Sequence, residues 1–255
     1  MDLKSVTNKT NGLIVILLVL ILVAIIGVLS LKMRSGNTND SSLVDLESKV
    51  EAFLMNNPKV VVNALEKHYR QEKELERTRR RDSISSKKQD LHNNSPFIGN
   101  PNADIVLVEF FDYNCGYCKK ALTTITELTD KNPDVKVVFK DFPILGPESL
   151  LLAQASLAAY EINPNKYFEA HKVLMSLGRS AKRNNIVSAL SAIGYNDVEL
   201  SKVMNSKKVN ERLAANRRLA KELGIGGTPA FILNDRFIEG FVDYSRLNQM
   251  ISEVQ

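Results

Sequence analysis

Residues 105–118, IVLVEFFDYNCGYC, place an apolar run directly before two closely spaced cysteines, and this stretch decides the fold. Ile105 to Phe111 has the length of a β-strand and is apolar at all positions but one, which is typical of a strand covered on both faces. The segment after the cysteines carries an apolar stripe at helical spacing and predicts a helix. The stripe consists of Ala121, Leu122, Ile125 and Leu128.

The elements that follow complete an α/β domain that begins near Ser95. Val135–Phe139, VKVVF, predicts a second strand, so that strand, helix and strand form a βαβ unit. Residues 147–223 are almost wholly helical in pattern. Two further strands are predicted at 228–233 and 237–242, joined by a tight turn, and a last helix follows them. The domain is therefore expected to span residues 95–255.

The first 34 residues contain an uncharged apolar run at positions 13–31. In a helix this run measures about 28 Å, close to the thickness of the hydrocarbon core of a membrane. The run is longer than the usual apolar core of a signal peptide, and no A-x-A cleavage pattern follows it. We therefore expect an uncleaved membrane anchor, with a cleaved secretory signal as the alternative. Two basic residues flank the run on each side, so charge does not set its orientation.

Residues 35–94 are predicted to form a helical arm and a basic linker. After a polar stretch, apolar side chains recur at helical spacing from Leu43 to Leu54, and Asn57–Pro58 restarts the helix. This apolar stripe has little nearby to cover it, so we expect it to mediate self-association or to dock on the main domain. The charged continuation from 71 to 88 is expected to be a solvated helix or a flexible link.

Charge and composition exclude several classes of protein. The chain has 255 residues, a net charge of +5 and 44% hydrophobic residues, which suits a folded globular protein. Residues 77–88 contain six basic residues and one acidic residue, so this segment carries the whole excess, and a nucleic-acid-binding protein is not expected. Three scattered histidines and two cysteines have no ligand spacing for zinc, and neither a metal site nor a cofactor is predicted.

The motif CGYC places Cys115 and Cys118 at the start of a helix. Free backbone N–H groups and the helix dipole favour the thiolate of Cys115 at this position. The spacing puts Cys118 on the same helix face within reach of a disulfide, so Cys115 can attack a disulfide and Cys118 can resolve the mixed disulfide. Gly116 relieves crowding where another chain approaches, and Tyr117 is a candidate contact for that chain.

Other roles for the two cysteines agree less well with the sequence. A stabilising disulfide between them would close too small a loop to contribute much stability. Half of a zinc site would need a second pair of ligands, which the sequence does not offer. A CxxC motif after a strand and before a helix therefore predicts redox function.

Two further features support this interpretation. Glu109 stands in the middle of the apolar strand, where a carboxylate either has a function or reaches solvent at a strand edge. Its functional interpretation is a proton acceptor for Cys118 through water, with a raised pKa. Thr228–Pro229 follows two glycines and opens a predicted strand. It indicates either a cis peptide bond or a trans proline that starts an edge strand.

VEFFDYNCGYCKKA, the long helical block and GGTPAFIL together resemble the DsbA-like thioredoxin-fold disulfide oxidoreductases of bacterial envelopes. The segment VEAFLMNNPKVVVNALEKHY resembles the N-terminal segment of the ScsC-type members. The resemblance covers about residues 45–255 and implies a thioredoxin fold with an all-helical insertion at 147–224. It implies that Cys115 is the nucleophile, Cys118 the resolving thiol and Glu109 the buried acid of the family.

The resemblance also implies that Pro229 is a cis-proline beside the dithiol. The Gly-Tyr dipeptide of the motif and the Thr228 before this proline look more like oligomeric disulfide isomerases than like the strong oxidases of the family. The protein is therefore expected to form or to isomerise disulfide bonds in other proteins. The alternative function is a membrane-anchored oligomeric chaperone or scaffold in which the cysteines are not essential.

A dithiol that acts on other proteins belongs in an oxidising compartment. Residues 35–255 are therefore expected in a bacterial periplasm, tethered to the inner membrane by residues 13–31 or soluble if that segment is cleaved. ScsC-type proteins are soluble in the periplasm, so an anchor would be a departure from them. The expected partners are reduced or misfolded envelope proteins, a membrane redox partner and, through the arm, further copies of the chain.

Overall fold

The structure, a computed structural model, describes residues 17–28, 38–179 and 181–253. The boundary between its two compact units falls between Lys73 and Glu74. Of the predicted span at 13–31, only residues 17–28 are described, and they are helical; the other positions lie outside the described residues. Among the residues that the structure describes, no helix is long and apolar enough to cross a membrane.

The arm consists of two long helices, as its periodicity predicts. Helix α2 covers Thr38–Asn56 and α3 covers Pro58–Ser86, so the helix restarts at Pro58. Within the first unit the apolar stripe is open to solvent, and Leu46, Val50 and Phe53 are each about half exposed.

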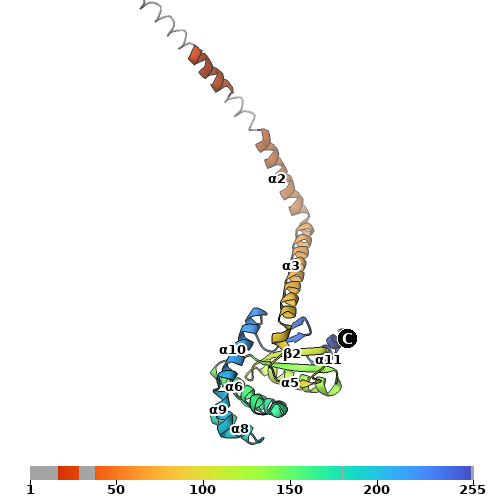
Figure 1. Cartoon of the computed structure of the whole chain (residues 1–255). Helices are drawn as coiled ribbons and strands as arrows, with labels where there is room; N and C mark the ends of the chain where they lie inside the picture. Colours follow the sequence, from red (N-terminus) through yellow and green to blue (C-terminus); the bar gives the residue numbers. More distant parts are fainter. Residues whose placement is uncertain (1–16, 29–37, 180, 254–255) are drawn as a thin grey trace, which may run out of the picture. The chain divides into compact units, whose positions relative to one another are not determined.

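The second unit, which includes the labelled strand β2 in Figure 1, is built on a five-stranded sheet. The strand order is β1-β3-β2-β4-β5. Strands β2 and β3 run parallel, and the other pairs are antiparallel. The strands are β1 (Phe97–Gly99), β2 (Ile105–Phe111), β3 (Val135–Asp141), β4 (Ala230–Leu233) and β5 (Arg236–Glu239). The parallel pair connected by a helix is the βαβ unit that the sequence predicts.

Helices cover both faces of this sheet. Along β2, Leu107 and Phe111 belong to the core on one face, and Val108 and Phe110 belong to the core on the other face. Because successive side chains of a strand alternate between faces, this accounts for an almost uninterrupted apolar strand. The helices are α4 (Lys88–His92), α5 (Gly116–Lys131), α6 (Pro147–Ile162), the short 3₁₀ helix η1 (Pro164–Lys166), α7 (Tyr167–Ser176), α8 (Arg183–Ser191), α9 (Asp197–Met204), α10 (Lys207–Glu222) and α11 (Tyr244–Ser252).

Different helices form the hydrophobic core on each face of the sheet. Helices α5, α6, α7 and α11 pack on the face that carries Leu107 and Phe111. The opposite face is covered by α10 together with Ile84 of α3 and Leu91 of α4. The described residues between α6 and α10 form only helices and their connections, in agreement with the helical pattern of this stretch.

Several boundaries differ from those expected from the sequence. The second unit reaches back to Glu74, beyond the boundary expected at Ser95, because Ile84 and Leu91 are buried against the sheet. Of the two alternatives expected for residues 71–88, the structure has the largely exposed helix, but Ile84 in its last turn belongs to the core. Strand β1 is an additional strand, and β4 and β5 are shorter than the segments expected at 228–233 and 237–242.

Candidate active site

Cys115 is the residue that caps the N-terminus of α5, and it follows β2 after a short turn. Its N–H group donates a hydrogen bond to the backbone oxygen of Asp112 at 3.0 Å. Its Sγ donates to the backbone oxygen of Thr228 at 3.1 Å, and the residue is 8% exposed. The sulfur therefore lies at the positive end of a sixteen-residue helix and at the margin of the solvent.

Cys118 lies in the first turn of α5 and is fully buried. Both cysteines are free thiols in this structure. Burial, and next the charge of Glu109, raise the pKa of the Cys118 thiol far above its ordinary value. The two cysteines of the motif are therefore unequal, because Cys115 keeps 8% of its surface exposed and Cys118 keeps none.

Glu109 points into the same core as Phe111, because the two residues are two positions apart on β2. Its register partners are Phe139 on β3 and Phe231 on β4, so the carboxyl group is in the middle of the sheet and is buried. Burial, and next the charge of Cys115, raise the pKa of Glu109 to about 8. Its Oε1 has no hydrogen-bond partner among the described residues, which leaves it free to accept a proton. The buried position agrees with the first of the two interpretations of Glu109 and not with a carboxylate that reaches solvent at a strand edge.

Thr228 and Pro229 are far from Cys115 in the sequence, but the fold places Thr228 in contact with it. The peptide bond between them is cis, which confirms one of the two interpretations of this dipeptide. Strand β4 begins at the following residue and pairs with β2, and this pairing brings the dipeptide to the N-terminus of α5. The hydrogen bond from Cys115 to Thr228 joins the two segments.

The surface beside the dithiol is aromatic. Tyr117 is 59% exposed and stacks on Phe241, with ring centroids 6.3 Å apart. The ammonium group of Lys120 lies 5.2 Å from the centre of the Tyr117 ring. A Cβ at Gly116 would meet no atom within 4 Å, so this position leaves open space. Phe241 is a site residue that the sequence analysis missed, because its loop is joined to the motif only by the fold.

Asp112 organises the loop that carries the motif, a role that the sequence does not predict. Its carboxylate accepts hydrogen bonds at 2.7 to 2.9 Å from the backbone N–H groups of Asn114, Ile144 and Leu145 and from the hydroxyl group of Ser149. The side chain is buried. It therefore fixes the turn before Cys115 to the loop that leads into α6.

We expect Asp112→Ala to lower the free energy of unfolding by about 3 kcal/mol or more, because buried donors lose a charged acceptor. Denaturant titration followed by circular dichroism measures this loss. Asp134→Ala is the matched control, since Asp134 is exposed, and it should change the free energy of unfolding by less than about 0.5 kcal/mol. Equal stability of the two variants would show that the hydrogen bonds of Asp112 contribute nothing.

A dithiol at the start of a helix, placed after the central strand of a thioredoxin-like sheet, defines a thiol–disulfide oxidoreductase. Residues 106–252 match the family described as DSBA-like thioredoxin domain. This match covers more than half of the chain, and the chain belongs to that family.

Several known proteins are similar to this chain in sequence, in fold or in both. The thiol-disulfide exchange protein α-DsbA2 from Wolbachia pipientis is 30% identical with a TM-score of 0.67, over 70% of this chain and 97% of its own. A crystal structure of ScsC from Proteus mirabilis is 28% identical with a TM-score of 0.61, over 84% of this chain and 96% of its own. Disulfide bond formation protein D from Bacillus subtilis is 24% identical over 62% of this chain and 76% of its own length. The protein is accordingly a disulfide oxidoreductase of the DsbA type.

Proposed function

We propose that the protein exchanges disulfide bonds with other proteins through Cys115 as the attacking or attacked sulfur and Cys118 as the resolving sulfur. The observation that carries this proposal is the unequal placement of the two thiols. Cys115 lies at the solvent margin beside Thr228, whereas Cys118 is fully buried one helical turn further on. Only one sulfur can then form a bond with a substrate, and the other can only release it.

In the oxidising direction, a substrate thiolate attacks Cys115 Sγ of the Cys115–Cys118 disulfide, and Cys118 leaves as a thiolate that takes up a proton. A second substrate thiolate then attacks the substrate sulfur of the mixed disulfide, and Cys115 is released. The substrate loses two electrons and two protons, and the dithiol gains them. In the isomerising direction, the Cys115 thiolate attacks a substrate disulfide, and a different substrate thiol later displaces it.

Glu109 serves in this proposal as the proton acceptor for Cys118 on the way to the disulfide. The charge of Glu109 raises the pKa of Cys118, so the two groups are close enough to interact. Oε1 of Glu109 has no hydrogen-bond partner among the described residues and can accept a proton or bind a bridging water. Only the ionised carboxyl can take the thiol proton when Cys118 attacks Cys115, and the protonated carboxyl returns a proton when Cys118 is released. Because the pKa of Glu109 is raised to about 8, the ionised fraction grows as the pH rises toward 8. Glu109→Gln cannot accept a proton and is expected to slow this step.

The raised pKa of Glu109 also predicts the pH dependence of stability. Between about pH 5 and pH 8 the unfolded carboxyl is ionised while the folded one still holds its proton, so the free energy of unfolding falls as the pH rises. Glu109→Gln should remove up to about 1.4 kcal/mol per pH unit from this slope. Two other buried groups contribute in both proteins: Asp141, whose pKa is raised to about 7 by burial, adds a slope of the same sign, and His171, whose pKa is lowered to about 3 by burial, adds a slope of opposite sign below about pH 6.5. Urea titrations across this range measure both slopes, and equal slopes in wild type and variant would contradict the assignment.

The direct test of the proposed function uses a reduced protein substrate and a scrambled one. We expect the purified protein to accelerate the oxidation or the reshuffling of these substrates, and the double variant Cys115→Ser/Cys118→Ser to be inactive. If the double variant retained full activity and deletion of the arm abolished it, the chaperone or scaffold function would hold instead.

The environment that suits this chemistry is an oxidising one, which supports a place in the bacterial periplasm. The substrates there are reduced or misfolded envelope proteins, and a membrane protein restores the redox state of the dithiol. The run at 13–31 is proposed to tether the protein to the inner membrane, or to direct its export if it is cleaved.

The arm is proposed to assemble several copies of the chain. Its support is the apolar stripe of α2, where Leu46, Val50, Leu54 and Met55 line one shallow groove on the surface of the first unit. Exposed apolar stripes of this kind commonly mark surfaces where a partner protein binds. The match with the ScsC chain, which spans 84% of this chain, also reaches beyond the catalytic domain.

We expect deletion of residues 38–73 to lower the oligomer mass measured by light scattering to that of one chain. The matched variant Leu46→Lys/Val50→Lys keeps the arm but places charges on its stripe, and it should dissociate the oligomer too. An unchanged mass in both variants would refute assembly through the arm.

A further inference from the structure

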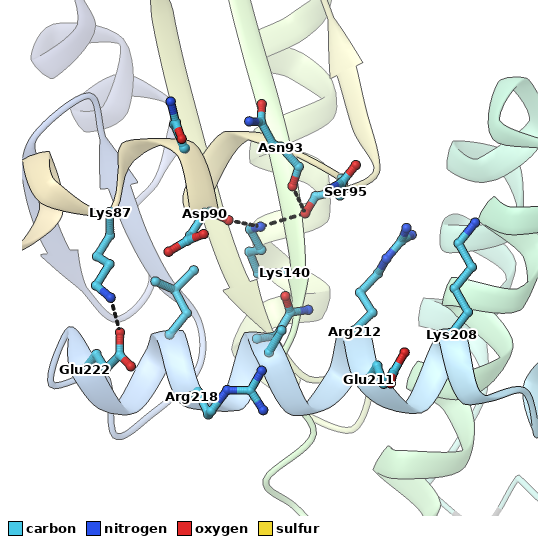
Figure 2. A pocket seen from close by; sticks show the side chains of 15 residues that line it. Lys87, Asp90, Asn93, Ser95, Lys140, Lys208, Glu211, Arg212, Arg218 and Glu222 are labelled. Carbon is cyan, nitrogen blue, oxygen red and sulfur yellow. Dashed lines mark hydrogen bonds and ion pairs between the residues drawn. The ribbon is translucent and has the colours of Figure 1, made fainter.

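A polar cleft lies on the face of the sheet opposite to the dithiol. It encloses about 730 Å³ between helix α10 and the segment that leads from α3 through α4 to β1. Five basic and three acidic side chains line it, and all of its residues belong to the second unit. Figure 2 shows α10 as one wall, with Lys208 and Arg212 at one end and Glu222 at the other. No step of disulfide exchange uses these residues.

The floor of the cleft contains a buried ammonium group, that of Lys140 on β3. Lys140 is 2% exposed, and its Nζ donates to the backbone oxygen of Asp90 and to Oγ of Ser95, both at 2.6 Å (Figure 2). An ammonium group has three donors, so one donor remains after these two bonds to uncharged oxygens. A buried charge without an ion pair is costly, and an anion in the cleft would offset this cost.

Further positive charge surrounds this ammonium group. Burial, and next the charge of Arg212, lower the pKa of Lys140 to about 8, so the two cations are close enough to repel each other. Arg212 and Lys208 share a single carboxylate, that of Glu161, so this ion-pair cluster keeps a positive charge. Arg218 has no ion pair among the described residues and stands further along α10.

Two of the three acidic side chains of the cleft are paired, and the third, Asp90, partly offsets the charge of Lys140. Glu222 pairs with Lys87 at 2.6 Å, and Glu211 lies 3.6 Å from Lys207. The unbalanced charge of the cleft is therefore positive, and it is greatest between Lys140 and Arg212.

The shape of the cleft suits an extended chain. Its lining follows α10 from Lys208 to Glu222, a rise of about 20 Å. An extended peptide of about six residues has this length. We propose that this cleft binds an extended acidic peptide segment of a partner protein, with a carboxylate seated between Lys140 and Arg212. Since the sheet separates the cleft from the dithiol, a bound segment leaves Cys115 free to react.

The test is fluorescence anisotropy with a cysteine-free, labelled heptapeptide that contains three glutamates, and with the same peptide carrying glutamines instead. The full-length Cys115→Ser/Cys118→Ser protein is used, so that no covalent adduct can contribute and failure of the redox proposal would not affect the result. We expect the glutamate peptide to bind at least about tenfold more tightly than the glutamine peptide. The preference should weaken as NaCl rises from about 50 to about 300 mM.

Lys208→Glu/Arg218→Glu reverses two exposed charges of the cleft and should reduce the affinity for the glutamate peptide at least about tenfold. Lys172→Glu/Lys202→Glu makes the same charge change at exposed positions outside the cleft and should leave the affinity within about twofold. Equal binding of the two peptides, or equal losses in the two variants, would overturn the proposal. If inorganic phosphate displaced the peptide far more strongly than NaCl of equal ionic strength, the cleft would be a site for small oxyanions instead.

Discussion

Cys115→Ser is expected to reduce the rate of disulfide exchange by at least about a thousandfold, because a serine hydroxyl is not ionised near neutral pH and cannot form a disulfide. The fold should survive this change, since the two side chains have similar volumes and the hydroxyl can still donate to the backbone oxygen of Thr228. The rate is measured with a reduced substrate enzyme that becomes active only after its disulfide bonds form.

The control for this variant is its thermal unfolding, which should stay close to that of the wild type. A rate above about one tenth of wild type in a folded Cys115→Ser protein would mean that Cys115 is not the reacting sulfur. Exchange that depended on the arm and not on Cys115 would then favour the chaperone function.

Cys118→Ser is expected to convert the protein into a trap for its substrates. Without a resolving thiol, the mixed disulfide on Cys115 has lost its fastest route of release, so covalent adducts should accumulate. Non-reducing electrophoresis detects these adducts, and a reductant should cleave them. Cys118→Ala is the matched variant, because it removes the thiol without placing a hydroxyl in a fully buried position.

Both Cys118 variants should form adducts, and the double variant that also lacks Cys115 should form none. Mass mapping of the adducts should place every bond on Cys115. Adducts that persisted without Cys115, or an absence of adducts in both single variants, would contradict the roles given to the two sulfurs.

The central part of the fold follows from the sequence because its signals are local. The apolar run of β2 and the stripe of α5 predict a buried strand followed by a helix, and the structure places both at Ile105–Phe111 and Gly116–Lys131. Strand β1 has only three residues and pairs as an edge strand, so it offers too short a pattern to detect. The burial of the end of α3 does not follow from the sequence, because Ile84 is a single apolar residue within a charged segment and is buried only by packing on the sheet.

The same distinction holds for the candidate site. The placement of Cys115 follows from the strand and helix that flank it, and the burial of Glu109 follows from its apolar neighbours in β2. The role of Asp112 could not be predicted, because three of its four donors, on Ile144, Leu145 and Ser149, are more than thirty positions away along the chain. The same is true of Lys140, whose unusual burial in the cleft results from the packing of α4 and α10 over β3.

The most direct test of the account is the redox equilibrium of the dithiol. The wild-type protein is equilibrated with mixtures of reduced and oxidised glutathione, quenched with acid, and analysed by mass spectrometry. We expect one two-electron transition from the free dithiol to an intramolecular bond between Cys115 and Cys118. Two thiols that stayed reduced in every mixture, or that formed only separate adducts with glutathione, would contradict a functional dithiol at this site.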